Sequence, residues 1–146
     1  MFKNLILLSM LVFYSNLYAS CSLEMSSGDL LKFNKRELII DSSCSKFAIY
    51  FKHEGEMAAK TFGHNVVIVE KKNFDKVKSR IDMKLGEEQG YLPDMQEIIA
   101  KTGIIGGGGR TSVTIDATKL SKDIEYMFFC SFPGHYGGMQ GPVKIM

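Results

Sequence analysis

Three possible metal ligands lie close together near the C-terminal end of the chain: Cys130, His135 and Met139, with the spacing Cys-x4-His-x3-Met. A thiolate, an imidazole and a thioether form a soft set of donors that suits copper in both of its oxidation states. A three-coordinate copper site needs a second imidazole, and the remaining histidines are His53 and His64. His64 lies at the mouth of a predicted strand, whereas His53 continues the apolar face of another strand and is interpreted as a core residue. The sequence therefore predicts a copper site built from His64 and the three clustered residues.

Other functions for these residues fit less well. Zinc accepts a cysteine and two histidines, but it rarely uses methionine. A copper enzyme needs a second copper or a cluster with more imidazoles, and the chain has three histidines in all. A copper chaperone or storage protein favours exposed ligands in Met-rich or His-rich tracts, and this alternative stays open. The other methionines after the N-terminal segment are dispersed: Met25, Met57, Met83, Met95, Met127 and Met146. We expect an electron carrier rather than an enzyme.

The composition indicates a compact globular protein. The chain has 146 residues, and 18 Lys+Arg against 16 Asp+Glu give a net charge of +2. That balance offers no clustered basic face for nucleic acid. The apolar content of 45%, with 10 Phe and 6 Tyr, is sufficient for a packed core. We find no internal repeat and no linker, so residues 20–146 are expected to form one copper-binding domain.

The N-terminal residues have the pattern of a signal peptide. A short positive start is followed by the nine-residue apolar run Leu5–Phe13 and by a small-residue cleavage site at Ala19. A membrane span needs about 20 apolar residues, so we expect no stable membrane insertion. The prediction is a signal peptide over residues 1–19, with Ser20 or Cys21 as the mature terminus.

Export changes the expected state of the cysteines. In an oxidising compartment two of the three should pair and one should be left over. Cys21 and Cys44 lie at the ends of the first two strand-like segments. A bridge between them would contribute about 3 kcal/mol in the chain-entropy description. Cys130 would then stay reduced either through burial or through a metal.

Most of the remaining sequence predicts short strands. Phe47, Ile49 and Phe51 alternate with more polar residues, and Val66–Val69 is a continuous β-branched run that suits a strand covered on both faces. Further strands are expected at Ser22–Ser26, Glu37–Asp41, Ile98–Ile104, Ser112–Asp116, Glu125–Cys130 and Pro142–Met146. Many short strands separated by turns predict an antiparallel β-sandwich.

Two segments depart from the strand pattern. Apolar residues recur at helical spacing between Asn73 as a cap and Gly86 as a stop, namely Phe74, Val77, Ile81 and Leu85. The basic residues around them are expected on the solvated face of a helix docked on the sandwich. The Gly106–Gly109 tract lacks the GKS/T ending of a phosphate-binding loop and is interpreted as a flexible hairpin connection.

Over the whole mature chain, the sequence resembles the azurin family of bacterial blue copper proteins. The Cys130–Met139 loop has the azurin spacing, whereas plastocyanin-like relatives have a shorter Cys-to-His gap. Further matching stretches are Phe62-Gly63-His64-Asn65, Tyr126-Met127-Phe128-Phe129-Cys130 and the separation of Cys21 from Cys44. The resemblance implies an all-β, eight-stranded Greek-key β-sandwich (the cupredoxin fold) with one inserted helical flap, and a Cys21–Cys44 disulfide.

The resemblance also implies roles for individual residues. His64, Cys130 and His135 would be the equatorial ligands of one copper ion that cycles between Cu(II) and Cu(I). Met139 would be a long axial ligand, opposed by the backbone carbonyl of Gly63. Around the ligands, Asn65 would tie the two ligand loops together, Phe132 would help to exclude water, and His53 would be a buried non-ligand histidine.

Partners and compartment follow from the same resemblance. The expected docking patch around His135 is apolar and consists of Leu31, Met57, Phe62, Pro133 and Gly134. Transient partners would be c-type cytochromes, reductases or peroxidases, and the compartment would be the bacterial periplasm. Two departures from the family are visible: Val66 stands where azurins often have tryptophan, and Tyr136-Gly137-Gly138 stands where azurins tend to carry smaller and then apolar side chains.

Overall fold

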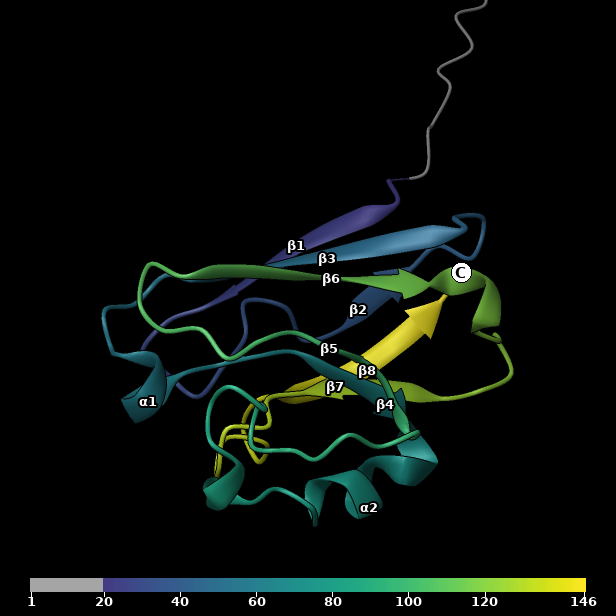
Figure 1. The fold of residues 1–146 in the computed structure, drawn as a ribbon. Coiled ribbons are helices and arrows are strands. Elements are labelled where there is room, and N and C mark those ends of the chain that lie inside the picture. Colours follow the sequence, from purple (N-terminus) through teal and green to yellow (C-terminus); the bar gives the residue numbers. More distant parts are fainter. Residues whose placement is uncertain (1–19) are drawn as a thin grey trace, which may run out of the picture.

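The structure, a computed structural model, describes residues 20–146, and the predicted signal peptide lies outside the described residues. Two β-sheets lie face to face, as Figure 1 shows. The first sheet has the order β1 (Ser22–Ser27), β3 (Lys46–His53) and β6 (Arg110–Asp116). The second has the order β2 (Leu38–Ile40), β8 (Gln140–Ile145), β7 (Tyr126–Phe129), β4 (Val67–Glu70) and β5 (Ile98–Lys101). Within residues 20–146, no helix has both the length and the apolar character needed to cross a membrane.

The eight-stranded β-sandwich is confirmed, but two of its strand pairs are parallel where antiparallel pairing was expected. β1 pairs with β3 in parallel, and β2 pairs with β8 in parallel. The chain passes from the first sheet to the second after β1 and returns before β3. β1, β2 and β3 therefore alternate between the two sheets, and such crossovers permit parallel neighbours. Turn signals in a sequence mark where strands end and carry no information about which sheet the chain enters next.

Strand periodicity correctly predicted the buried faces. Phe51 and His53 on β3 are buried between the sheets. On β4, Ile68 packs into this core with Phe128, whereas Val67 contributes to a second cluster outside the sheet with Phe129. The continuous apolar run therefore reflects a strand that is covered on both faces.

The predicted long helix is instead a series of short pieces. It is divided into η1 (Lys71–Asn73), α2 (Phe74–Lys78) and η2 (Met83–Leu85). The side chain of Asn73 makes no capping hydrogen bond, contrary to our expectation. The break has a local cause: Asp82 is extended, and its N–H donates to the carbonyl of Tyr91. Gly86, at a φ of 71°, ends η2. The helical piece still covers the second sheet, where Val77 is buried.

The glycine tract is a crossover and not a hairpin. It connects β5 of the second sheet to β6 of the first. The N–H of Gly107 donates to the carbonyl of Met57. A Cβ atom placed on Gly106 would lie 2.3 Å from the backbone nitrogen of Ala59, so only glycine permits this approach. The tract therefore packs against α1 (Ala59–Phe62), a one-turn helix that is too short to show a periodic pattern.

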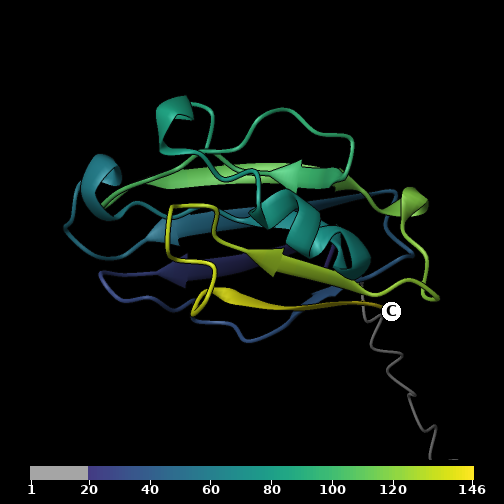
Figure 2. The ribbon, with the colours of Figure 1, turned by 90° about the horizontal axis from the view of Figure 1, so that it is seen from below.

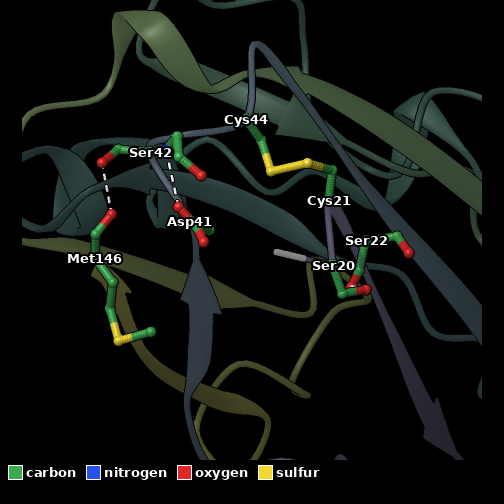
Figure 3. The surroundings of a disulfide bond; sticks show 8 residues. Ser20, Cys21, Ser22, Asp41, Ser42, Cys44 and Met146 are labelled. Carbon is green, nitrogen blue, oxygen red and sulfur yellow. Dashed lines mark hydrogen bonds between the residues drawn. A yellow bond between two sulfur atoms is a disulfide. The ribbon is translucent and has the colours of Figure 1, made fainter. Parts of the chain in front are cut away.

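The two ends of the sandwich differ in content. Figure 2 shows α1, the β1–β2 connection and the β7–β8 loop toward one end, and η3 (Ala117–Lys119) with the C-terminus at the other. The Cys21–Cys44 disulfide lies at the end of the sandwich that holds the C-terminus, and its Cα–Cα distance is 5.6 Å (Figure 3). Ser42 adds a hydrogen bond from its N–H to the carbonyl of Met146. The expected pairing is confirmed, and it is remote from the candidate ligands.

Candidate metal centre

Three potential ligand atoms converge inside the protein. Nδ1 of His64 lies 3.1 Å from Nδ1 of His135, and Sγ of Cys130 lies 3.9 Å from each of these nitrogens. All three side chains are buried. Among residues 20–146, this is the one group of at least three His, Cys, Asp or Glu side chains with the compactness of a metal site.

Neighbouring strands position two of the three residues. His64 lies just before β4 and is paired with Ile105 through hydrogen bonds in both directions, of 3.0 and 2.9 Å. Cys130 directly follows β7, and Val67 on β4 pairs with Phe129 on β7. Because the pairing is antiparallel, the start of β4 and the end of β7 meet at the same edge of the sheet.

The third residue is held by turns in the β7–β8 loop. The N–H of His135 donates to the carbonyl of Phe132, and the N–H of Met139 donates to the carbonyl of His135, both at 3.0 Å. The loop closes where the N–H of Cys130 donates to the carbonyl of Met139, also at 3.0 Å. Met139 is fully buried beside its loop partners. The loop thus brings the backbone of Met139 back beside the backbone of Cys130.

Gly63 permits the close approach of the chain before His64. A Cβ atom at this position would lie 2.3 Å from the carbonyl oxygen of Ala59 and 2.5 Å from Cγ2 of Ile104. Its φ is −76°, so the requirement for glycine comes from space and not from an unusual backbone conformation. Gly63 is buried next to His64.

The hydrogen bonds of His64 define its protonation. Its Nε2 lies 2.9 Å from the carbonyl oxygen of Gly28. A carbonyl only accepts hydrogen bonds, so Nε2 carries the proton and Nδ1 presents a lone pair toward His135. Burial lowers the pKa of His64. Burial also lowers the pKa of His135, to about 4, and the charge of the neighbouring His64 makes a smaller contribution in the same direction. Both rings are therefore neutral at neutral pH, as metal ligands must be.

The thiol of Cys130 is electrostatically different. Burial raises its pKa to about 12, and hydrogen bonds from the backbone N–H groups of Asn65 and Phe132 act in the opposite direction. A buried thiolate needs a compensating positive charge. Two neutral imidazoles and one thiol therefore form a set that fits a soft cation, which would replace the thiol proton.

Asn65 joins the two ligand-bearing segments. Its Oδ1 accepts a hydrogen bond of 2.9 Å from the N–H of Ser131, and its Nδ2 donates one of 2.9 Å to Oγ of the same residue. The Ser131 hydroxyl donates in turn to the carbonyl of Gly90 at 2.6 Å. On the other side, Oγ1 of Thr102 accepts from the N–H of Val66 at 3.0 Å. Sequence reasoning missed Ser131 and Thr102, because a single polar residue gives no sign that its side chain is buried.

Aromatic rings surround the histidines. The His135 ring lies between Phe132, at a centroid distance of 4.3 Å, and Phe62, at 4.6 Å. His53 stacks on His64 at 4.9 Å with 13° between the planes. Nδ1 of His53 accepts from the N–H of Gly55 at 3.1 Å, and its Nε2 lies 3.3 Å from the carbonyl oxygen of Phe62. Backbone groups therefore occupy both nitrogens of His53, which lies outside the ligand cluster.

The five residues of the predicted docking patch, which we call the apolar patch, differ in exposure. Leu31 is 46% and Met57 37% exposed, and Gly134 is also exposed. Phe62 and Pro133 are half-buried. Leu30, which sequence reasoning missed, is 60% exposed beside Leu31.

The two departures from the family pattern have separate consequences. Val66, which stands where azurins often have tryptophan, is fully buried in the core between the sheets. Tyr136 packs against the cluster under α2, and Nζ of Lys78 lies 5.6 Å from the centre of its ring. The first departure is therefore internal, whereas the second connects the β7–β8 loop to the helical flap.

Comparison with known proteins identifies the family. Residues 19–146 match the family described as copper binding proteins, plastocyanin/azurin family. An azurin from Alcaligenes faecalis is 38% identical over 127 residues, which cover 86% of this chain and 98% of the relative. An azurin from Pseudomonas aeruginosa is 36% identical over 130 residues, which cover 88% of this chain and 87% of the relative. A solved structure of azurin iso-2 from Methylomonas sp. strain J superimposes with a TM-score of 0.81 at 36% identity, covering 88% of this chain and 99% of that one. The chain belongs to the plastocyanin/azurin family of copper-binding proteins.

Proposed function

We propose that this protein is a periplasmic electron carrier that holds one copper ion and passes electrons between redox proteins such as c-type cytochromes. The copper would supply one-electron chemistry by alternating between Cu(II) and Cu(I). His64, Cys130 and His135 would hold the copper, and the thioether of Met139 and the carbonyl of Gly63 would be further donors. The observation that carries the proposal is the buried triangle of two Nδ1 atoms and one Sγ atom.

The surroundings of the triangle suit a group that changes charge without moving. His64 and Cys130 are fixed by paired strands, and Asn65 links their segments. Ligands that the protein holds in place need little rearrangement when the metal gains or loses an electron. Phe132 and Phe62 cover the third ligand and limit access of water.

His135 is the proposed route of electron entry and exit. It is 5% exposed, whereas His64 and Cys130 are fully buried. Its loop neighbours Pro133 and Gly134 belong to the apolar patch, whose five residues carry no charged side chain. Small contact areas are typical of transient redox complexes.

The buried ligands argue against the alternative function of copper chaperone or storage protein. Delivery of copper to another protein requires ligands that an incoming donor can reach. Here none of the three side chains is exposed. Rapid transfer of copper to a competing copper-free protein, together with slow electron exchange, would favour the chaperone.

The decisive experiment is titration of the purified, signal-free protein with one equivalent of Cu(II). Visible absorption and electron paramagnetic resonance should show an intense blue thiolate-to-copper band and a narrow copper hyperfine splitting. A pale spectrum with wide splitting would show that Cys130 does not bind copper, and the proposed carrier would lose its chemistry. Periplasmic location is tested separately, by fractionating cells that express the full chain.

A further inference from the structure

Three exposed cations are concentrated in one five-residue segment of the connection between β1 and β2. We call Lys32, Lys35 and Arg36 the basic strip. Within residues 20–146, no carboxylate lies within ion-pairing distance of any of these three side chains. Four lysines on and beside α2 differ, because they form the ion pairs Lys71–Glu125, Lys72–Glu70, Lys76–Glu97 and Lys78–Asp75. The strip is thus positive charge that the protein itself does not neutralise.

The backbone of the strip is anchored. Phe33 is buried within it, with its ring centre 5.8 Å from that of Phe51 and 5.4 Å from that of Phe128. The N–H of Asn34 donates to the carbonyl of Ser26, and Oδ1 of Asn34 accepts from the N–H of Ser26. The backbone positions from which the three charged side chains extend are therefore held against the sandwich.

The strip borders the end of the candidate ligand loop. A Cβ atom on Gly138 would lie 2.8 Å from the carbonyl oxygen of Leu31, and one on Gly141 would lie 2.3 Å from that of Arg36. Residues 31–36 thus run alongside the segment that contains Met139, as the dark-blue and yellow segments in Figure 2 show. Leu31 belongs to the apolar patch and is followed directly by Lys32, so the strip begins at the residue next to the patch.

We propose that the apolar patch and the basic strip form one docking surface for an acidic redox protein, whose exposed cofactor edge is surrounded by carboxylates. The strip would attract and orient the partner over a distance that depends on the ionic strength, and the patch would make the close contact next to His135. A second copy of this chain fits poorly, because two strips would repel each other. This inference rests on the proposed function and specifies the chemistry of the partner.

The test compares two double variants with equal charge changes. Lys35→Glu/Arg36→Glu reverses the strip, and Lys119→Glu/Lys122→Glu makes the same change in η3 and the segment after it, at the end of the sandwich that holds the C-terminus (Figure 2). The copper-loaded proteins are mixed, by stopped flow, with a reduced c-type cytochrome that has an acidic surface. At about 10 mM ionic strength, where charges act over roughly 30 Å, the strip variant should react about tenfold more slowly than wild type. The control should stay within about twofold, and the difference should shrink at about 0.5 M salt, where charges are screened.

Three results would overturn the docking proposal. Equal slowing of both variants would show that net charge alone matters, and unchanged rates in both would remove any role for the strip. The third result is binding to vesicles of anionic phospholipid by wild type but not by the strip variant, with unchanged cytochrome rates. The strip would then be a site for lipid headgroups. Failure of the proposed function looks different, because wild type itself would then lack the blue band or would not oxidise the cytochrome.

Discussion

The side chain of Asn65 is hydrogen-bonded to both the backbone N–H and the hydroxyl of Ser131, each at 2.9 Å. Asn65 follows His64 directly, and Ser131 follows Cys130 directly. This pair therefore fixes the separation between the two backbone segments that carry candidate ligands. Both residues are fully buried, so water does not replace either hydrogen bond when one partner is removed.

Substitution of Asn65 should lower stability measurably. In Asn65→Ala, the buried N–H of Ser131 loses its acceptor, and the free energy of unfolding of the copper-free protein should fall by about 3 kcal/mol. Urea denaturation followed by fluorescence or circular dichroism measures the change. Asn73→Ala is the matched control, because its side chain makes no capping hydrogen bond, and it should change stability by less than about 0.5 kcal/mol. Equal effects of the two substitutions would contradict a linking role for Asn65.

Removal of the Cys130 thiol should abolish the blue colour. Cys130→Ser replaces the soft sulfur donor by a hydroxyl of similar size, so the charge transfer from thiolate to copper disappears. Visible absorption after addition of one equivalent of Cu(II) measures the loss. An intense blue band in this variant would be incompatible with the proposed ligand set.

Removal of the His135 ring should create a site that an added ligand can restore. The ring lies between Phe62 and Phe132, so His135→Gly leaves a slot of imidazole shape next to the apolar patch. The blue band and fast electron exchange should require added imidazole in the variant, whereas wild type should not respond to imidazole. Unchanged colour and exchange without imidazole would exclude His135 as ligand and electron route.

Removal of the disulfide should affect stability and leave the metal site intact. Cys21→Ala/Cys44→Ala opens a loop near Met146 (Figure 3), at the end of the sandwich opposite the β7–β8 loop (Figure 2). The free energy of unfolding should fall by about 3 kcal/mol. The blue band of the copper-loaded variant should match that of wild type at temperatures where the variant is folded. Loss of the band in the folded variant would show that the two ends of the protein are coupled.

Asp29 should contribute a pH-dependent part of the stability. Its carboxylate accepts hydrogen bonds from the N–H groups of Glu56 and Met57, and these bonds lower its pKa. The folded protein therefore binds this proton at lower pH than the unfolded chain does. The contribution to stability is complete above the unfolded pKa of about 4 and is lost as the pH falls through the lower folded pKa.

Unfolding of Asp29→Asn in urea at several pH values measures this contribution. The variant should be less stable than wild type at pH 7, and the difference should diminish as the pH falls below about 4. Asp94→Asn is the control, since the Asp94 carboxylate accepts no hydrogen bond from the described part of the chain. Parallel stability curves for wild type and Asp29→Asn would refute the assignment.

Local patterns predicted the parts of the fold that depend on neighbouring residues. Alternation at Phe47, Ile49 and Phe51 correctly gave the buried face of β3, and the Val66–Val69 run indicated a strand covered on both faces. The helix prediction failed after Lys78, because the N–H of Asp82 donates a hydrogen bond to the carbonyl of Tyr91. Tyr91 lies in a loop, and apolar periodicity does not predict contacts with loops. The crossover of Gly106–Gly109 was missed because a turn signal does not reveal which sheet follows.

The sequence by itself determined the donor types and their spacing, from Cys130 to Met139, and the strands that carry them. Donor chemistry and strand periodicity are local properties, so they can be read from neighbouring residues. Only the tertiary structure decided that Nδ1 of His64 lies 3.1 Å from Nδ1 of His135, that Asn65 binds Ser131, and that the basic strip borders the ligand loop. These contacts join residues far apart in the chain, and they depend on strand pairing and on the packing of two sheets, which no local pattern specifies.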